Sequence, residues 1–267
     1  MLGRMLGQGR KSEVYECSDG VVIKLFFATV EPEAVEVDYA ASRLASDLGL
    51  PCPRVLGRKT VDGRAGILFE RVDGPALLHV LMSGQGNTAE LAQQFGSQQA
   101  KINQQRPEGL PEYRTVLLEL LNNAPEGWFT NKQINQLADY VRHLPEGDHL
   151  CHMDYHPDNV LVETGDLKVI DWAMAMRGPA VFDFAYSLLV LTSGDLPPGL
   201  TEEQMQFIAT IRKQLFESYV ESYTALSGLS LEDTKPYTLA SQLFRLLFWQ
   251  LEVERPSLLK NIARELS

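Results

Sequence analysis

The amino-acid sequence predicts an α+β fold with two lobes, a small β-rich N-terminal lobe and a larger, mainly helical C-terminal lobe. Segments rich in β-branched residues flank a single helix in the first 72 residues, whereas most later segments have helical periodicity. The length, 267 residues, suffices for two such lobes. We place the boundary where Asp73, Gly74 and Pro75 interrupt a strand, which gives lobes of residues 1–72 and 73–267.

The N-terminal lobe contains two clear strand signals and one helix signal. Residues 21–26 are β-branched or aromatic and follow a turn, so they predict a strand, as do residues 64–72. Residues 32–48 repeat apolar side chains at helical spacing. Pro32 suits the first turn of this helix, and Gly49 suits its end.

The C-terminal lobe is mostly helical, with one strand pair. The predicted strands are residues 160–162 and 167–170, joined by a turn that contains Gly165. The predicted helices cover residues 88–104, 111–123, 130–143, 179–192, 201–226, 236–253 and 256–266.

Charge and composition narrow the classes of partner. Lys and Arg number 24 and Asp and Glu number 35, so the formal net charge is −11. This acidic balance argues against nucleic acid or an anionic membrane as a partner and is compatible with a cationic small molecule. The N-terminus shows no signal-peptide pattern, and no apolar run reaches the roughly 20 residues of a membrane span, so we expect a cytoplasmic protein. The three cysteines lie far apart and predict neither disulfides nor a zinc site.

One stretch carries residues suited to phosphoryl transfer. Asp154 precedes Asn159 by five residues, and the predicted strand pair then leads to Asp171. Asp154 could orient an acceptor hydroxyl and take its proton, while Asn159 and Asp171 supply oxygen ligands to Mg²⁺. Asp and Asn are also common in turns, but the strand pair that ends on Asp171 makes that explanation weaker.

A glycine-rich segment near the N-terminus predicts a phosphate-binding loop. Gly7 and Gly9 let the backbone approach a phosphate, and Ser12 follows them. The segment is not a Walker A loop. Lys24 lies in an otherwise apolar strand, where a charge needs a partner or a ligand. An ordinary hairpin and a solvent-exposed edge lysine are the alternatives.

A phosphate-binding lysine needs a carboxylate to hold it, and the helix at 32–48 offers two. Asp38 flanks the predicted buried face, whereas Glu36 lies on the predicted solvent face. We therefore expect Asp38 to pair with Lys24, and Glu36 stays open as the alternative.

These motifs, in this order, resemble the aminoglycoside phosphotransferase and choline kinase family, which has a protein-kinase-like two-lobe fold. The resemblance rests on the pattern His-x-Asp-x-His-Pro-x-Asn-Val-Leu from His152 and on Ile-Asp-Trp at 170–172. It implies that residues 1–72 are a nucleotide-binding lobe and residues 73–267 a catalytic and acceptor-binding lobe. It also implies that a buried aspartate, here Asp183, ties down the catalytic loop.

The resemblance implies a role for each motif residue. Asp154 is the expected catalytic base, and Asn159 and Asp171 are the expected Mg²⁺ ligands. Lys24 is expected to contact the α- and β-phosphates of ATP. The backbone of Glu70 and Val72 is expected to contact the adenine, and since backbone groups suffice there, GTP remains an alternative donor. Met153 stands where relatives commonly have glycine.

The expected activity is transfer of the γ-phosphate to a hydroxyl of a small molecule, with a cationic acceptor such as an aminoglycoside or an amino alcohol favoured. The segment between Asp171 and Asp183 is too short for the activation loop of a protein kinase. Two alternatives remain: a catalytically silent nucleotide-binding regulatory module, and a kinase for a neutral acceptor such as a sugar or homoserine.

Overall fold

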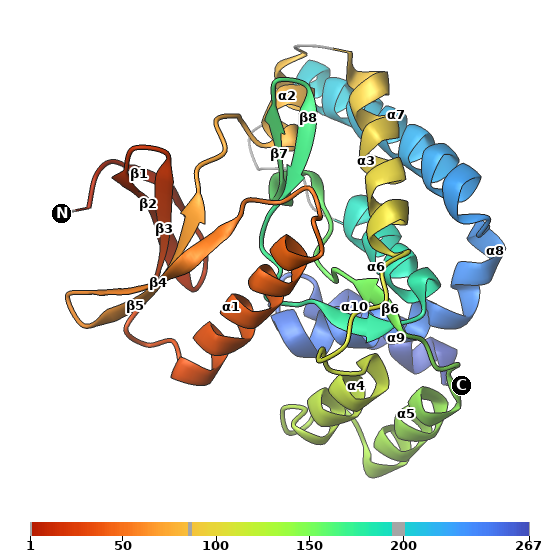
Figure 1. Cartoon of the computed structure of the whole chain (residues 1–267). Helices are drawn as coiled ribbons and strands as arrows, with labels where there is room; N and C mark the ends of the chain where they lie inside the picture. Colours follow the sequence, from red (N-terminus) through yellow and green to blue (C-terminus); the bar gives the residue numbers. More distant parts are fainter. Residues whose placement is uncertain (1, 85–86, 194–200, 267) are drawn as a thin grey trace. The chain divides into compact units, whose positions relative to one another are not determined.

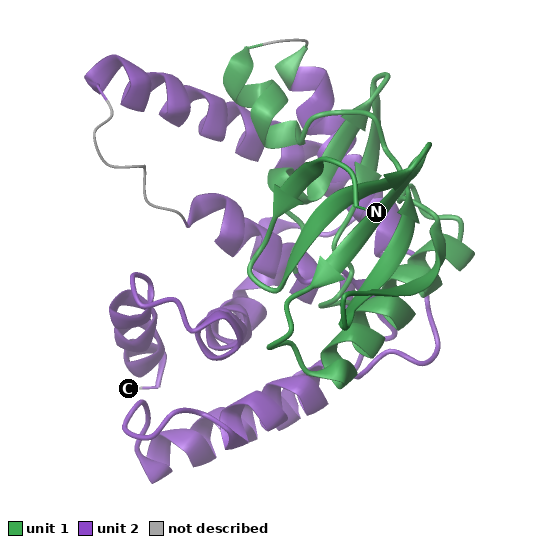
Figure 2. Ribbon diagram, turned by 90° about the vertical axis from the view of Figure 1, so that its left-hand side faces the viewer, with its two compact units in different colours: residues 1–88, 154–175 green, residues 89–153, 176–267 purple. Residues whose placement is uncertain are grey.

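The computed structural model describes residues 2–84, 87–193 and 201–266. The chain divides into two compact units, shown in Figure 2: residues 1–88 with 154–175, and residues 89–153 with 176–267. The first unit thus takes in residues 154–175, a segment distant from its other part in sequence. The lobe boundary that we place after residue 72 is a different division of the chain, and it stays a prediction.

The first unit is built on a five-stranded antiparallel sheet (Figure 1). Its order is β1-β2-β3-β5-β4. The bounds are β1 Met5–Gln8, β2 Ser12–Ser18, β3 Val21–Phe26, β4 Val55–Val61 and β5 Arg64–Glu70. In the centre of the sheet, Lys24 on β3 lies opposite Val14 on β2 and Ile67 on β5.

Helix α1 (Pro32–Asp47) packs against this sheet. Val35 on the helix joins Phe26 and Ile67 from the sheet in a core cluster. The residues that α1 buries are Val35, Asp38, Ala41, Ser42 and Ala45. Val37, which the apolar spacing places on the buried face, is 54% exposed. The buried face is therefore turned slightly from the predicted one, and Asp38 lies within it.

The later segment of the first unit contributes a short 3₁₀ helix and a hairpin. The bounds are η1 Pro157–Asn159, β7 Val160–Glu163 and β8 Asp166–Val169, with α2 Leu77–Ser83 from the earlier segment. Gly74, just before α2, approaches the hairpin so closely that a Cβ there would lie 1.9 Å from the Val162 carbonyl oxygen. The Val162 N–H donates to the carbonyl of Pro75 at 2.9 Å. These contacts fix the hairpin to the chain after β5.

The second unit is mainly helical, as the sequence predicts. Its elements are α3 Thr88–Ile102, α4 Tyr113–Asn122, α5 Asn131–His143, β6 His149–Cys151, β9 Met176–Gly178, α6 Ala180–Thr192, α7 Glu202–Ser227, α8 Leu231–Thr234, η2 Lys235–Tyr237, α9 Thr238–Phe244, η3 Arg245–Trp249 and α10 Arg255–Glu265. Strands β6 and β9 pair with each other. Helices α3 and α7 come very close at Gly96, where a Cβ would lie 2.4 Å from the Tyr219 carbonyl oxygen.

The core of the second unit is rich in aromatic side chains. Phe184 stacks on Tyr223 with ring centroids 4.0 Å apart, and Phe95 contacts Tyr219. These rings come from α3, α6 and α7 and join the three helices. The α+β prediction is confirmed.

The continuous helix predicted over 236–253 is wrong in detail. The helix widens into a π-helical turn over Arg245–Trp249 and ends at Gln250, whose φ is 49°. Two side-chain contacts accompany the wider turn: Arg245 pairs with Glu254, and the Trp249 indole donates to the Tyr186 hydroxyl. Apolar spacing does not distinguish such a turn from regular α-helix. Within the described residues, no helix is long and apolar enough to cross a membrane.

Candidate active site

Asp154 and Asn159 are joined directly in the first unit. The Asn159 side-chain nitrogen Nδ2 donates to Asp154 Oδ2 at 2.8 Å and to the Asp154 carbonyl at 2.9 Å. The His156 ring nitrogen Nε2 lies 3.5 Å from Asp154 Oδ1. The Asp154 side chain is only 7% exposed. One amide thus fixes both the backbone and the carboxylate of Asp154.

The hairpin connects Asn159 to Asp171. The Ile170 N–H donates to the Asn159 carbonyl at 2.9 Å, and Val160 pairs with Val169 in the β7–β8 ladder. Asp171 follows with a φ of 63°, a left-handed conformation that Asp adopts more readily than most residues. This turn directs the chain out of the ladder, and the Asp171 side chain is 42% exposed.

Lys24 lies between two carboxylates. Its Nζ donates to Asp38 Oδ2 at 2.7 Å and to Asp171 Oδ1 at 3.0 Å. Burial lowers the pKa of Lys24, but the charges of Asp171 and Asp38 outweigh burial, so the pKa is raised well above its ordinary value. The lysine therefore stays charged at any physiological pH.

The two candidate partners on α1 make different contacts. Asp38 is buried, pairs with Lys24, and accepts a hydrogen bond from the Ser42 hydroxyl at 3.1 Å. Glu36 is exposed and pairs with Arg58 on β4. The structure thus brings Asp38, and not Glu36, to Lys24.

The glycine-rich segment forms the β1–β2 turn. The Gly9 N–H donates to the Ser12 carbonyl at 2.8 Å, and Ser12 begins β2. Neither Gly7 nor Gly9 has a left-handed φ, and a Cβ would meet nothing within 4 Å at Gly7 and only the Ser12 carbonyl, at 3.8 Å, at Gly9. Neither backbone conformation nor packing requires these glycines, and the space beside them is open to a ligand.

Glu70 and Val72 lie at and beyond the end of β5. The Glu70 N–H donates to the Arg54 carbonyl at 2.9 Å, and its side chain accepts two hydrogen bonds from the Arg54 guanidinium. Val72 follows in a half-buried segment outside the strand. The Glu70 side chain is therefore engaged by Arg54.

The donor set near the end of the hairpin suits a hard cation. Asn159 and Asp171 offer amide and carboxylate oxygens, the ligands that Mg²⁺ prefers. The Asn159 nitrogen is directed at Asp154, so its side-chain oxygen is the atom left for a metal. Across residues 2–84, 87–193 and 201–266, no group of three or more His, Cys, Asp or Glu side chains forms a metal cage. The residues present fit a Mg²⁺ ion that takes its remaining ligands from phosphate and water.

In the second unit, Asp183 on α6 holds the residue that precedes Asp154. It is fully buried, and its Oδ1 accepts a hydrogen bond from the Met153 N–H at 2.8 Å. Its other oxygen accepts from the side chains of Gln99 and Asn103, both at 2.8 Å. Sequence reasoning missed Gln99 and assigned no role to Asn103. Asn103 directly follows α3 and lies four residues after Gln99, and this helical spacing of two amides is the signal that could have indicated them.

Aromatic and acidic side chains, which could bind a cation, also occur in α7 and after η3, but several of them make other contacts. Tyr219 and Tyr223 are fully buried, and their hydroxyls donate to Gln99 and Asn103. Glu254 pairs with Arg245, and exposed Glu217 pairs with Lys213. These aromatic rings are therefore core residues and do not form an exposed surface for a cation.

A model of the phosphotransferase enzyme family matches residues 3–219. A comparison with curated protein sequences gives no match. The family match covers every residue singled out above as a nucleotide, metal or catalytic contact.

Solved structures of similar proteins extend the comparison. The choline kinase of Cryptosporidium parvum has a TM-score of 0.61 at 14% identity, over 99% of this chain and 88% of that one. The aminoglycoside 3′-phosphotransferase of type VIII has a TM-score of 0.59 at 19% identity, over 89% and 90%. An aminoglycoside phosphotransferase from Streptomyces rimosus, also solved with ADP and streptomycin, has a TM-score of 0.58 at 17% identity, over 87% and 88%. These likenesses confirm the predicted fold.

Proposed function

Because the chain belongs to the phosphotransferase enzyme family, we propose that it transfers the γ-phosphate of ATP to a hydroxyl of a small molecule, with Asp154 as catalytic base. The observation that carries the proposal is that the first unit contains two features. The Asp154 carboxylate is fixed by Asn159, and Lys24 lies between the carboxylates of Asp38 and Asp171. Phosphoryl transfer needs these parts because it depends on positioning and charge stabilisation.

The proposed step begins at the acceptor hydroxyl. Asp154 accepts the hydroxyl proton as the acceptor oxygen forms a bond to the γ-phosphorus. The bond between that phosphorus and the bridging oxygen breaks, and ADP leaves with its electron pair. Asn159 supports this role because its two hydrogen bonds fix the orientation of Asp154.

The charged groups act on the nucleotide. Lys24 would bind the α- and β-phosphates, and Asp38 would hold it in place from α1. Asn159 and Asp171 would hold Mg²⁺, which when bound offsets the negative charge of the phosphates. Gly7, Gly9 and Ser12 would border the phosphates, which is consistent with the open space at both glycines.

We propose ATP as the donor, because similar aminoglycoside phosphotransferases have been solved with ADP bound. The backbone groups of Glu70 and Val72 would bind the base. GTP remains an alternative donor, since such contacts do not depend on side chains. Use of a nucleoside triphosphate also favours action in the cytoplasm.

For the acceptor we propose a cationic small molecule, an aminoglycoside or an amino alcohol. The net charge of −11 supports a cation, as do relatives solved with streptomycin and gentamicin. A neutral acceptor is the alternative, and the acidic surface gives no reason to prefer it.

The test separates the base from the metal ligand. Asp154→Asn should lower kcat by about 10³-fold or more, while the affinity for Mg²⁺-ATP stays within about threefold, because Asp154 contacts the acceptor. Asp171→Asn should instead weaken Mg²⁺-ATP binding by about tenfold or more, because a charged metal ligand is lost. Calorimetry and product formation with a panel of hydroxylated amines measure both. Near-native kcat in Asp154→Asn contradicts the base, and wild-type protein that binds Mg²⁺-ATP but phosphorylates nothing supports the regulatory module.

A further inference from the structure

Asp183 is a buried carboxylate held by uncharged groups. Its side chain accepts hydrogen bonds from the Met153 N–H and from the side chains of Gln99 and Asn103. A buried carboxylate needs such donors, because nothing in a protein core replaces its lost hydration otherwise. The orientation of the two amides therefore decides how firmly Met153 is held.

Asn103 connects Asp183 to several other parts of the second unit. Its Nδ2 donates to Asp183 Oδ2 and to the Leu150 carbonyl, both at 2.8 Å. Its Oδ1 accepts from the Tyr223 hydroxyl at 2.7 Å, and its backbone carbonyl meets His149 Nδ1 at 2.5 Å. Asn103 thus joins the ends of α3 and β6 to α6 and α7.

The two tyrosines set the direction of the amides. The Tyr223 hydroxyl donates to the Asn103 oxygen, and the Tyr219 hydroxyl donates to the Gln99 oxygen. Burial first, and then the charge of Asp183, raise the pKa of Tyr223 above its ordinary value, so its hydroxyl remains a donor. Because each amide oxygen is occupied by a hydroxyl, each amide nitrogen is left to face Asp183.

The segment held in this way leads directly to the proposed catalytic base. Asn103 holds Leu150 on β6, and through Asp183 it holds Met153, which immediately precedes Asp154. Met153 has a φ of 61°, a left-handed conformation that is unfavourable for a residue with a side chain. A residue in that conformation persists only where its surroundings impose it, and the bond to Asp183 does so.

We propose that Asn103, oriented by Tyr223, is a positioning residue that sets the backbone before Asp154 for phosphoryl transfer; this inference rests on the proposed function. Asn103 touches neither nucleotide nor acceptor in this proposal. Its effect passes through Asp183 and Met153 to the place of the Asp154 carboxylate. A misplaced base slows the chemical step and leaves the phosphate contacts of Lys24 and Asp171 intact.

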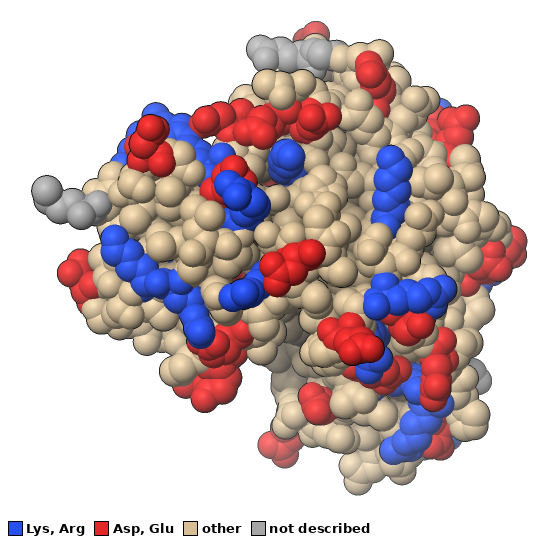
Figure 3. Space-filling view, in the orientation of Figure 1, with Lys and Arg blue, Asp and Glu red and all other residues tan. Residues whose placement is uncertain are grey.

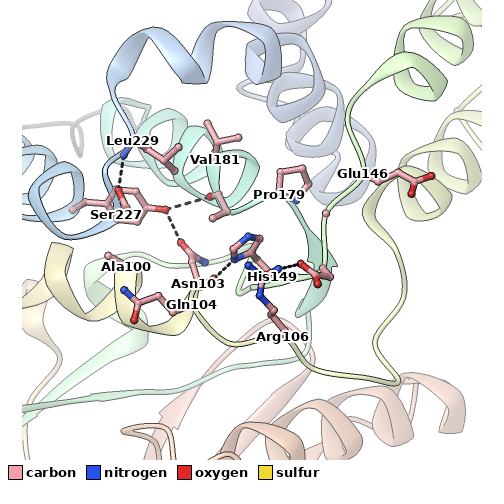
Figure 4. Close-up of a pocket in the computed structure, with 14 residues that line it drawn as sticks. Ala100, Asn103, Gln104, Arg106, Glu146, His149, Pro179, Val181, Ser227 and Leu229 are labelled. Atoms are coloured by element: carbon pink, nitrogen blue, oxygen red, sulfur yellow. Dashed lines mark hydrogen bonds and ion pairs between the residues drawn. The ribbon is translucent and has the colours of Figure 1, made fainter.

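Asn103 also borders a pocket of about 530 Å³ in the second unit. Figure 4 shows Asn103 beside His149 at this pocket, with Val181 and Ser227 from α6 and α7 around it. The cluster is therefore not sealed inside the protein on every side. Water in the pocket can compete for the Asn103 amide once Tyr223 no longer holds it.

The experiment compares two buried tyrosines of the second unit. Tyr223→Phe removes the hydroxyl that orients Asn103. Tyr113→Phe removes a hydroxyl that donates to the Pro145 carbonyl at 2.6 Å and is the matched control, because Tyr113 is equally buried. We expect Tyr223→Phe to lower kcat by about three- to tenfold and to leave the KM for ATP within about twofold. This decrease corresponds to the loss of one hydrogen bond. Tyr113→Phe should lower Tm about as much as Tyr223→Phe does, but it should leave kcat within about twofold of the wild-type value.

A second measurement does not depend on catalysis. Hydrogen exchange of the Met153 and Asp154 amides in the whole protein should quicken in Tyr223→Phe by about fivefold or more and stay unchanged in Tyr113→Phe. Asn103→Leu should give the larger effect on both readouts, and if it fails to fold, Tyr223→Phe decides. Equal kcat and equal exchange in the two tyrosine variants overturn the inference. A wild-type protein without kinase activity overturns the proposed function instead, and hydrogen exchange then decides the positioning.

Discussion

At the scale of single residues, Lys24 connects the parts of the candidate site that come from distant positions in the chain. It bonds to Asp38 on α1 at 2.7 Å and to Asp171 beyond β8 at 3.0 Å. The Asp38 side chain is only 3% exposed, so this pair is far less screened by solvent than the exposed pair of Glu36 and Arg58. Removal of one partner from a buried pair leaves an uncompensated charge, which is why Asp38 and Glu36 should differ in effect.

The first prediction compares these two acidic residues. Asp38→Asn keeps the size of the side chain but removes its charge, so Lys24 is drawn toward Asp171 alone. We expect kcat/KM for ATP to fall by about tenfold or more, and Glu36→Gln to change it by less than about twofold, since exposed pairs contribute about 1 kcal/mol or less. Steady-state kinetics at varied ATP measure both variants. A larger defect in Glu36→Gln contradicts the assignment of Asp38.

Met153 is a second residue whose conformation carries information. A non-glycine residue with left-handed φ costs roughly 1–3 kcal/mol, and Met153 is also fully buried. Asp183 meets this cost through its bond to the Met153 N–H. A glycine at this position would need no such support, so this chain depends on its buried cluster more than a chain with glycine would.

At the scale of elements, the sequence predicts those parts whose signal is local. The strand at Val21–Phe26, helix α1 and the β7–β8 hairpin follow from side-chain type and turn residues within a few positions. The short helix α2 and the β6–β9 pair are absent from our predictions. Each depends on distant segments: β6 pairs with β9, and α2 contacts η1 and β7.

The residues of the candidate site also fall into two groups, those that a local sequence pattern predicts and those that it does not. Asp154, Asn159 and Asp171 lie within one stretch of 18 residues, so sequence reasoning finds them together. The cluster around Asp183 joins α3, α6 and α7, and neither Gln99 nor Asn103 shows locally that it faces a buried carboxylate. Apolar spacing also predicts that Val37 is buried. In the structure Val37 is exposed, and Asp38, which pairs with Lys24, is buried.

The second prediction concerns the contact between two elements at Gly74. A Cβ there would lie 1.9 Å from a backbone atom of the hairpin, which cannot yield as a side chain can. We expect Gly74→Ala to lower the free energy of unfolding by about 2 kcal/mol or more. Gly7→Ala should change it by less than about 0.5 kcal/mol, because the space at Gly7 is open. Urea unfolding with unchanged m-values measures both, and similar losses in the two variants contradict the close approach.

At the scale of the whole molecule, the charge is acidic but locally mixed. Figure 3 shows Lys and Arg side chains interspersed with Asp and Glu on the face drawn. Many basic side chains are paired, including Arg54 with Glu70 and Arg71 with Glu16. The net charge of −11 therefore acts through many carboxylates together. Their summed electric field attracts a cation, and salt weakens this attraction.

The third prediction follows from this field. For a cationic acceptor, kcat/KM should fall by about tenfold between 20 mM and 500 mM salt, because screening shortens the reach of the acidic charge. A neutral hydroxylated acceptor measured beside it is the control and should change by less than about twofold. Initial rates at saturating Mg²⁺-ATP give both values. If the best acceptor of a broad panel is neutral or anionic and its rate is independent of salt, the cationic acceptor is wrong while the kinase proposal stands.

The first unit is formed by two separate segments of the chain, and this affects how it folds during synthesis on the ribosome. The bond between Lys24 and Asp171 spans 147 positions, and the Val169 N–H reaches back to the Pro51 carbonyl. At about 5–20 residues per second, residue 175 is made roughly 5–20 s after Glu70, the last residue of the sheet. Until then the five strands and α1 lack the hairpin that completes them, so the nascent sheet stays exposed to mispairing for that interval. Slow translation of residues 89–153 would lengthen that exposure and favour aggregation of the newborn chain.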